Sequence, residues 1–366
     1  MINILVVGQT PPPYGGQAIM IKYMLDNFQS PNSIKHVRMC FSKEFNDRGK
    51  LSLYKIIHLI QIIYKIWLYR FKYRCNTLYY PLSSSPKVAV FRDAIILGLT
   101  RFLFKKIIYH FHAAGISEEL PKYNLIIRNI IYMIIKKPDL AITSSEYNPK
   151  DAEYLRAKKK LIIPLGIPDE NIEKKRKVTN QENPLNILFV GLLNSTKGEG
   201  YLLEAINQLK TRGINTKLRI AGKFESEDYK DLFFSKIKEY GLEKNIIYKG
   251  IVTGKEKENL FLKSDILCFP SFFSSESFGM VLLEAMMYQM PIIATRWRGI
   301  QSIVEEERNG YLVPIKDSHS LAKSIEKLHY DRALLKKMAE NSRMIFKEKY
   351  ELSNYINSME NAIFNS

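Results

Sequence analysis

Two glutamates eight positions apart are the residues whose spacing first suggests chemistry. Glu276 and Glu284 enclose a segment in which Phe278 and Gly279 predict a turn and Met280 begins a helix. Backbone amides at the start of a helix can hold a phosphate group. A carboxylate further into that helix can accept two hydrogen bonds from a ribose diol, which suits Glu284, while Glu276 would face a cleft. By themselves, two glutamates at this spacing also fit a solvated helix face.

The elements around these glutamates repeat the order strand, turn, helix along the whole chain. Short apolar runs such as INILVVG at 2–8 end in glycine or proline, as buried parallel strands do. This alternation predicts an α/β fold with doubly wound parallel sheets. The predicted strands are 2–8, 36–41, 77–80, 106–111, 139–144, 160–166, 185–191, 217–222, 245–250, 265–270 and 291–295, and the predicted helices are 51–72, 88–104, 120–137 and 147–157, with a mostly helical tail from about 318.

The chain is long enough for two such sheets. Its 366 residues suit two domains of about 150–200 residues each. The polar segment 167–184 lacks strong periodicity and predicts a linker, after which the strand at 185–191 restarts the pattern. We expect two Rossmann-like domains, 1–178 and 179–345, facing each other across a cleft, and a terminal helix at 346–366 that crosses back to the first domain.

Basic residues are concentrated in the first half of the chain. The whole sequence has 55 Lys and Arg against 37 Asp and Glu, a net charge of +18. Residues 1–178 hold 29 of the basic and 13 of the acidic residues, so +16 of this charge lies there. An excess of basic residues confined to one half of the chain predicts that this half binds an anionic partner.

One predicted helix has two interpretations. In the segment 51–75 the apolar residues form a helical stripe, but five basic residues interrupt it, so no uncharged run reaches the ~20 residues of a membrane span. The helix is either buried in the first domain or lies on an anionic membrane surface, where each nearby basic residue contributes roughly 1 kcal/mol. The stripe consists of positions 53, 56, 57, 60, 63, 64, 67 and 68.

Cysteine usage and the first residues of the sequence predict a cytoplasmic protein. Cys40, Cys75 and Cys268 form no CxxC pair, and their odd number indicates reduced thiols, most simply small core residues. The first apolar run has about six residues and no basic region before it, unlike a signal peptide.

Five ordered segments resemble the family 4 retaining glycosyltransferases, and the fourth carries that family's E-x7-E pattern at Glu276 and Glu284. The segments are PPPYGGQAIM (11–20), IIPLGIP (162–168), ILFVGLLNSTKGEGYLLEAI (187–206), PSFFSSESFGMVLLEAMMYQMPIIAT (270–295) and NGYLVP (309–314). The resemblance implies the GT-B fold and transfer of a sugar from a nucleotide diphosphate sugar, with retention of anomeric configuration. It implies no metal and no cofactor, and UDP is expected ahead of GDP in the donor.

The resemblance also implies roles for single residues. Lys197 would neutralise the donor diphosphate, which a compact ammonium suits. Glu284 would bind the donor ribose, and Glu276 would contact the transferring sugar. Gly15 and Gly16 would let the chain approach the diphosphate closely, because they carry no Cβ. Alternatively, Lys197 is a solvated lysine of a loop, and Gly15 and Gly16 form a plain turn after proline.

His112 resembles the family's active-site histidine, which lies near the reacting carbon. It ends a predicted strand in YHFHAAG. His110 is expected to point the opposite way, because side chains alternate along a strand, so His112 is the candidate. The catalytic residues would then be His112 and Glu276, unless His112 is merely structural.

The remaining donor contacts would come from backbone. The turn at Phe278, Gly279 and Met280 would help Lys197 compensate the diphosphate charge. The nucleotide base would lie near Ile251 and Val252, whose backbone contacts leave no trace in a sequence.

The sequence departs from the family pattern at two places. Leu192 stands where the family often has an arginine, so a phosphate-binding cation is missing there. Arg296 and Arg298 are candidates to replace it. Arg298-Gly299-Ile300 stands where the family usually has two glycines and a small or acidic residue, which weakens a donor role for that loop.

The expected acceptor is a saccharide, most simply a lipid-linked one in bacterial surface polysaccharide assembly. The basic first domain would bind it at the inner face of the cell membrane, with an anionic membrane surface as a further partner. The alternatives are a soluble small-molecule acceptor or a GT-B epimerase. No nucleic acid is expected, because the lysine runs at 158–160 and 174–177 come without a nucleic-acid-binding motif.

Overall fold

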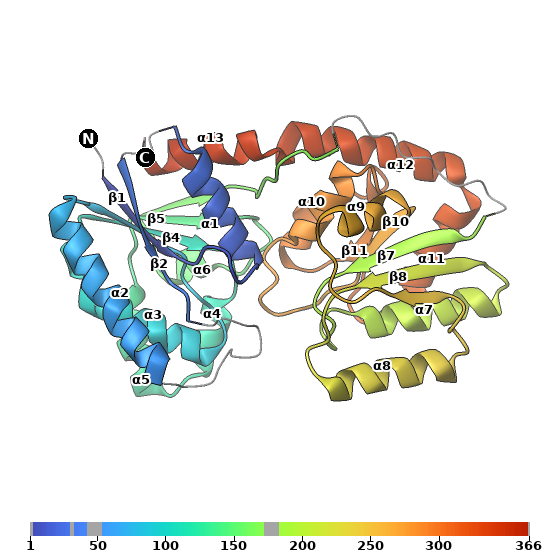
Figure 1. Ribbon diagram of the computed structural model, residues 1–366, viewed down its shortest axis with the longest axis horizontal. Helices are drawn as coiled ribbons and strands as arrows, with labels where there is room; N and C mark the ends of the chain where they lie inside the picture. The colour runs from blue at the N-terminus through green and yellow to red at the C-terminus, as the bar shows by residue number, and fades with distance from the viewer. Residues whose placement is uncertain (1–2, 30–32, 42–52, 172–182, 365–366) are drawn as a thin grey trace. The chain divides into compact units, whose positions relative to one another are not determined.

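The chain forms two compact units, each built around one parallel sheet (Figure 1). A computed structural model describes residues 3–29, 33–41, 53–171 and 183–364. The first unit comprises residues 1–165 and 352–366, and the second comprises residues 166–351. Two Rossmann-like, doubly wound sheets were expected from the alternation of strands and helices, and this fold class is confirmed.

The first sheet has six parallel strands in the order β2-β1-β3-β4-β5-β6. Its strand order therefore reverses between β1 and β3. All five residues of β1 are buried, which explains its continuous apolar sequence, because helices cover both faces of the sheet (Figure 1). The strands are β1 (Ile4–Gly8), β2 (Ile34–Arg38), β3 (Thr77–Tyr80), β4 (Lys106–Phe111), β5 (Leu140–Thr143) and β6 (Lys159–Ile162).

The helices of the first unit include one from the far end of the chain. The ring of Phe364 meets that of Phe28 edge to face, with 6.1 Å between the centroids, so the last helix packs against the first. The helical elements are α1 (Gly16–Asn27), α2 (Leu53–Lys72), α3 (Lys87–Thr100), η3 (Arg101–Leu103), α4 (Ile116–Glu119), η4 (Leu120–Lys122), α5 (Leu125–Ile135), α6 (Asp151–Tyr154) and α13 (Leu352–Phe364).

The second sheet repeats this design in the order β12-β11-β10-β7-β8-β9, with its reversal between β7 and β10. Ile187 of β7 pairs with Ile266 of β10 at that point, and both side chains are fully buried. The strands are β7 (Leu185–Val190), β8 (Thr216–Ala221), β9 (Ile246–Tyr248), β10 (Ile266–Phe269), β11 (Ile292–Thr295) and β12 (Gly310–Val313). The helical elements are α7 (Glu199–Thr211), α8 (Glu227–Glu239), α9 (Gly254–Leu262), α10 (Met280–Met287), η5 (Arg298–Ser302), α11 (Ser318–Tyr330), α12 (Arg332–Ile345) and the π-helical turn η6 (Phe346–Tyr350).

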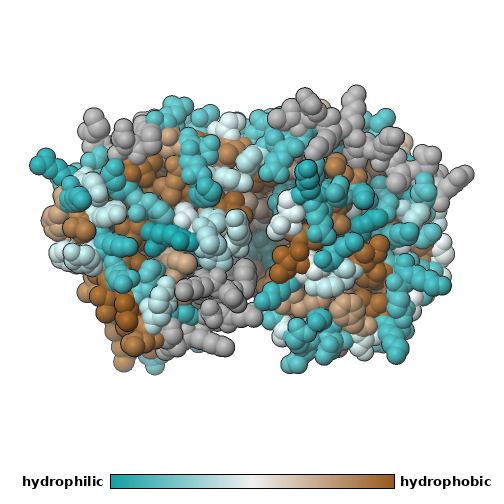
Figure 2. Space-filling model, viewed as in Figure 1, coloured by the Kyte–Doolittle hydropathy of each residue, from teal (hydrophilic) through white to brown (hydrophobic). Residues whose placement is uncertain are grey.

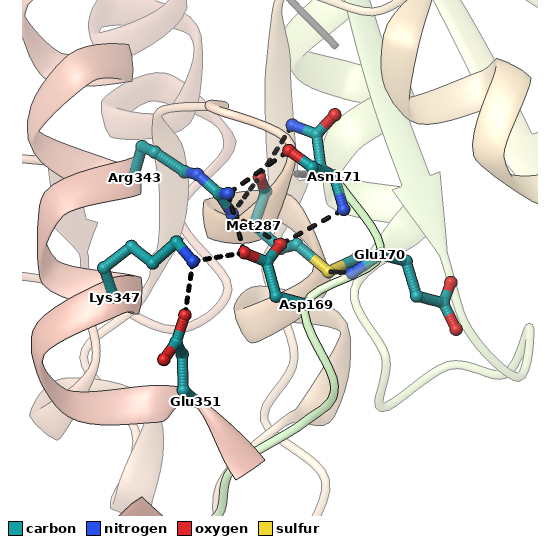
Figure 3. Close-up of polar contacts among 7 residues, drawn as sticks. All are labelled: Asp169, Glu170, Asn171, Met287, Arg343, Lys347 and Glu351. Atoms are coloured by element: carbon teal, nitrogen blue, oxygen red, sulfur yellow. Dashed lines mark hydrogen bonds and ion pairs between the residues drawn. The ribbon is translucent and has the colours of Figure 1, made fainter. Parts of the chain in front are cut away.

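Asp169 fastens the start of the second unit to α12 and η6 (Figure 3). The two guanidinium nitrogens of Arg343 donate to its two oxygens at 2.8 and 2.7 Å, and Lys347 Nζ lies 2.6 Å from Oδ2. Burial opposes ionisation of Asp169, but these hydrogen bonds outweigh it and lower its pKa to about 2. Residues 166–171 thus belong with the second unit, and the expected domain boundary at 178 lies outside the described residues.

The helices α2, α3, η3 and α5 leave an apolar face exposed on the first unit. Of the 28 large apolar side chains exposed within the described residues, 19 lie on these four elements. Figure 2 shows brown atoms gathered at the lower left, where α2, α3 and α5 stand in Figure 1. We call these 19 residues the apolar face: Leu53, Tyr54, Ile56, Ile57, Ile60, Tyr64, Trp67, Leu68, Phe71, Val88, Phe91, Ile95, Leu99, Phe102, Leu125, Ile126, Ile127, Ile130 and Met133.

The apolar stripe predicted in α2 forms part of this face. Within Leu53–Lys72 only Ile62 and Ile66 are buried, and they pack toward the sheet. Seven of the eight stripe positions are exposed instead, so the interpretation of α2 as a wholly buried helix is wrong. No helix in the described part of the chain has the length and hydropathy to cross a bilayer.

Candidate functional site

Gly198 brings the loop after β7 against the end of β10. Its φ is +83°, and a Cβ built there would lie 2.1 Å from the carbonyl oxygen of Pro270. No other residue type tolerates both the left-handed backbone and this approach. The Lys-Gly dipeptide of the sequence is therefore a packing requirement, and it delivers Lys197 to the carboxyl end of the neighbouring strand.

Lys197 forms an ion pair with Glu276 at this edge of the sheet. The Lys197 ammonium lies 2.6 Å from Glu276 Oε2, and the two side chains are only 15% and 12% exposed. Ser271 Oγ donates to the same carboxylate oxygen at 3.3 Å, and the ring of Phe273 lies 4.8 Å below the ammonium. Lys197 follows β7 and Glu276 follows β10, so the pair spans the reversal of strand order, where open α/β sheets bind ligands.

The turn before α10 presents backbone rather than side chains. Gly279 has a φ of +95° and precedes the first residue of the helix, Met280, which is partly exposed. Gly279 is the N-cap residue of α10 and has no side chain to accept hydrogen bonds from the first amides. The Phe278 side chain is buried, with its ring edge to face with Tyr350 at 5.9 Å between centroids. Any contact of this turn with a ligand would therefore come from its amides.

Glu284 is paired with a lysine that the sequence did not suggest. Lys257 of α9 places its Nζ 2.6 Å from Glu284 Oε1. Burial raises the pKa of the Glu284 carboxyl, and the charge and hydrogen bond of Lys257 oppose that rise. These residues are 27 positions apart on different helices, so no local pattern links them.

The loop after β9 lies at the carboxyl end of the edge strand of the second sheet. Ile251 is 69% exposed there, whereas Val252 is buried. A base approaching this loop would meet the Ile251 side chain as well as backbone.

The arginines expected to replace the missing cation at Leu192 have other surroundings. The Arg296 guanidinium lies 3.3 Å from Glu306 Oε2 on the surface. Arg298 is 8% exposed with a φ of +41°, and its guanidinium lies 5.3 Å from the ring of Trp297. Lys197 is thus the cation that the structure brings beside Glu276.

His112 follows β4 in the first unit and stacks on His110. Their ring centroids are 3.8 Å apart, so the expectation that His110 points the opposite way is wrong, because residues two apart on a strand share a side. The hydroxyl of Tyr79 lies 2.6 Å from His110 Nδ1 and 3.3 Å from His112 Nε2. Burial lowers the pKa of His112 to about 3, so its imidazole is neutral near pH 7.

Gly15 lies at the start of α1 with open space beside it. A Cβ built on it would meet no atom within 4 Å. It is the cap residue of α1, and Gly16 is the first helical residue, with no side-chain hydrogen bond to the helix start. The loop before them is held by Arg38, whose guanidinium donates to the carbonyls of Thr10 and Pro12.

A metal site is not evident in the ranges that the structure describes. No group of three or more His, Cys, Asp or Glu residues is arranged there to bind a metal ion.

The sequence matches one family and several curated relatives. Residues 170–344 match the family model of glycosyl transferases group 1. An uncharacterized glycosyltransferase of Methanocaldococcus jannaschii is 31% identical over 187 residues, which are 51% of this chain and 46% of that protein. An uncharacterized 41.2 kDa protein in the cps region of Klebsiella pneumoniae is 25% identical over 375 residues, 98% of both chains. The putative colanic acid biosynthesis glycosyltransferase WcaL of Escherichia coli is 26% identical over 254 residues, 62% of both chains.

Solved structures share the fold over the whole chain. Anabaena HepE in complex with UDP-glucose superposes with a TM-score of 0.74 at 16% identity, covering 99% of this chain and 100% of that one. The apo form of the lipopolysaccharide outer core galactosyltransferase WaaB gives a TM-score of 0.72 at 16% identity, covering 100% and 99%. These likenesses confirm the GT-B fold.

Proposed function

We propose that this chain, whose residues 170–344 match the group 1 glycosyl transferases, moves a hexose-type unit from a nucleotide diphosphate sugar to a saccharide hydroxyl, with retention of anomeric configuration and without a metal ion. The observation that carries the proposal is the buried Lys197–Glu276 pair at the strand-order reversal of the second sheet. It offers one cation for a diphosphate and one carboxylate for sugar hydroxyls, at the place where this fold class binds ligands.

Donor binding would exchange the partner of Lys197. Glu276 neutralises the Lys197 ammonium in the structure, and a diphosphate oxygen that reached Lys197 would take over that role. Glu276 would then be released to accept hydrogen bonds from the sugar. The amides at the start of α10 would stabilise charge on the departing diphosphate.

Glu284 would hold the donor ribose through its carboxylate. The charge and hydrogen bond of Lys257 oppose the rise in the pKa of Glu284 and so favour its ionised form, in which both oxygens act only as acceptors. UDP is our expected nucleotide, and its base would lie against Ile251 and Val252. The resemblance to HepE, which binds UDP-glucose, supports this choice.

His112 would act near the reacting carbon as a neutral hydrogen-bonding group. Its low pKa excludes a protonated imidazole at neutral pH, so it brings no positive charge to a carbon that itself becomes positive as the diphosphate leaves. The acceptor hydroxyl would attack from the same side, with the leaving phosphate taking its proton, and no protein nucleophile is required.

The acceptor would be a lipid-linked saccharide of a surface polysaccharide, held by the first unit at the inner face of the cell membrane. The first unit has 25 basic and 11 acidic residues, and the apolar face stands beside this charge. An apolar face bordered by lysine and arginine suits an anionic bilayer surface. The relatives named for capsule-region and colanic acid proteins fit such an acceptor.

A thermal-shift panel tests the donor site first. We expect UDP or UDP-sugars without metal to raise the melting temperature, since a ligand at about 100 times its Kd stabilises by roughly 2.7 kcal/mol. GDP and ADP should have a smaller effect. Absence of any shift, together with normal activity in Lys197→Ala, would remove this site from the proposal.

Vesicle sedimentation tests the membrane partner. Vesicles with anionic lipid should bind the protein at low salt, and zwitterionic vesicles should bind it less. Ile57→Glu with Tyr64→Glu, both on the apolar face, should weaken binding, whereas Leu232→Glu on α8 of the second unit serves as a control of similar exposure. Equal binding by both variants would contradict the assignment.

A further inference from the structure

A pocket lies at the strand-order reversal of the first sheet. It has a volume of about 380 Å³, within the range of ~300–1,000 Å³ that small-ligand sites occupy. Gln9 and Gln17 reach it from the segment after β1, and Ser83 and Ser85 reach it from the segment after β3. These are the two strands between which the order reverses, so the pocket occupies the position where open α/β sheets bind ligands.

Polar and cationic residues form part of the pocket lining. Lys55 and Arg92 line it, and no carboxylate is among the described lining residues. Arg92 is held in place by Asp93 Oδ1 at 2.6 Å and Ser83 Oγ at 2.9 Å, and its side chain keeps 23% of its surface exposed. The start of α3, at Pro86, also borders the pocket, with no side chain capping its first amides. Two cations and a helix start suit a phosphate group.

Apolar residues form another part of the lining. Ile56 of α2 and Val88, Phe91 and Ile95 of α3 line it, and all four belong to the apolar face. Each is 39–49% exposed, so the pocket and the apolar face share these four residues. A purely water-soluble saccharide would gain nothing from such a wall, because burying apolar surface favours apolar ligands.

We propose that this pocket binds the phosphate head and the first part of the hydrocarbon chain of a lipid that carries the acceptor saccharide. The cationic end would hold the phosphate, and the rest of the chain would follow the α2–α3 surface toward the bilayer. This inference rests on the proposed transferase function, and it locates the acceptor lipid on particular residues.

Binding of farnesyl diphosphate to the full chain, measured by calorimetry below its micelle concentration, tests the pocket. We expect farnesyl diphosphate to bind at least tenfold more tightly than farnesol or inorganic diphosphate, because each of these lacks one end of the ligand. Lys55→Ala should weaken the binding of farnesyl diphosphate severalfold and leave the binding of farnesol unchanged. Inorganic diphosphate binding as tightly as farnesyl diphosphate would overturn the proposal.

Matched glutamate variants separate the pocket from the rest of the apolar face. Ile95→Glu and Ile56→Glu place a charge in the pocket wall and should weaken farnesyl diphosphate at least tenfold. Leu99→Glu and Ile60→Glu lie one turn further along the same helices, are 51% and 61% exposed and do not line the pocket, so they should change binding less than threefold. Equal losses in both sets would show that the lipid merely adsorbs to the face and would refute the pocket.

Two further measurements distinguish binding of the acceptor lipid from binding of other lipids, and distinguish the pocket from the transferase proposal on which it rests. Dihexanoyl phosphatidic acid should displace farnesyl diphosphate poorly, and equal displacement would mean a general phospholipid site rather than an acceptor site. UDP should raise the melting temperature of all four variants, because the second unit is unchanged. If the wild-type protein did not bind farnesyl diphosphate but UDP still raised its melting temperature, the pocket alone would be refuted. Farnesyl diphosphate binding with no UDP effect would support the pocket and count against the transferase proposal.

Discussion

The ammonium of Lys197 and the carboxylate of Glu276 lie 2.6 Å apart, one after β7 and the other after β10, where the order of the second sheet reverses. Each side chain satisfies the other in a site that is mostly closed to water. A ligand that pairs with one of them therefore changes the surroundings of both. This coupling makes the effects of substituting the two residues opposite in direction.

Lys197→Ala should weaken UDP binding about 10–100-fold, since hydrogen bonds to charged groups are worth about 1.5–3 kcal/mol. Glu276→Gln should instead keep or strengthen UDP binding, because it removes the carboxylate that competes for Lys197. Its turnover should fall on the order of 100-fold if the sugar is misplaced. Calorimetry with UDP and steady-state rates would measure the two effects. Weaker UDP binding in both variants would contradict partner exchange.

Lys257→Met should make donor binding dependent on pH. Lys257 opposes the rise in the pKa of Glu284 that burial causes, so its removal raises that pKa further. A protonated Glu284 accepts fewer hydrogen bonds, so the UDP affinity of the variant should fall as the pH is lowered and recover as it is raised. Titrations across a range of pH would reveal the trend, and Lys255→Met, two residues earlier in α9, is the control. A pH-independent loss would point to a purely steric role.

His112→Ala should lower turnover without weakening UDP binding. Because the pKa of His112 is about 3, the wild-type rate should show no ionisation of this residue between pH 5.5 and 8.5. Tyr79→Phe, which removes the hydroxyl beside both histidines, should cause a smaller loss. The measurement is kcat against pH. A step near pH 6.5 that disappears in His112→Ala would contradict a neutral imidazole.

Glu199→Gln should stabilise the protein at pH 8 and leave it unchanged near pH 4. Burial raises the pKa of Glu199 from 4.5 to about 7, against opposing effects of its backbone, Tyr229 and Lys197. Between these values the unfolded state loses the proton first, so wild-type stability falls as pH rises through 7. The difference is on the order of 1–3 kcal/mol, or several degrees in Tm. Parallel melting curves at pH 4 and 8 would test it. A difference in Tm between the two proteins that is the same at pH 4 and pH 8 would contradict this prediction.

Asp169→Asn should destabilise the second unit at neutral pH by about 2–3 kcal/mol, because Arg343 and Lys347 lose their shared carboxylate. The pKa of Asp169 is lowered from 3.8 to about 2, so its contribution is present above pH 3.8 and is lost as the pH falls through 2. The free energies of unfolding of the wild type and the variant should therefore converge as the pH falls. Denaturant melts at pH 7 and pH 3 would follow this. A difference that does not shrink at low pH would argue for a packing effect.

The sequence predicts strands well where an apolar run is bounded by turn residues. The strands at 77–80 and 106–111 occur over those residues, because a strand buried on both faces must be apolar throughout. The strand Gly310–Val313 was noticed only as a family motif, since four residues carry little periodicity. The helix expected at 147–157 shrinks to Asp151–Tyr154, beside Pro149, which has no amide hydrogen to donate.

Side-chain partners were harder to predict than elements. The Lys-Gly and E-x7-E patterns drew attention to Lys197 and Glu276, and the close approach of Gly198 to Pro270 explains why they meet. The pairing of Lys257 with Glu284 depends on how two helices pack, which no spacing encodes. The stripe on α2 misled for a related reason, because a helical period reveals an apolar side but not what covers it.

The return of α13 to the first unit sets an order on synthesis. Residues 166–351 are contiguous, so the second unit has all of its chain as soon as residue 351 leaves the ribosome. The first unit must wait for a helix that is translated after its neighbour, although its strands were made first. Tyr355, Met359 and Ile363 of that helix are buried, so their places stay open until then. During translation the earlier-made half of this protein is therefore the later one to be completed.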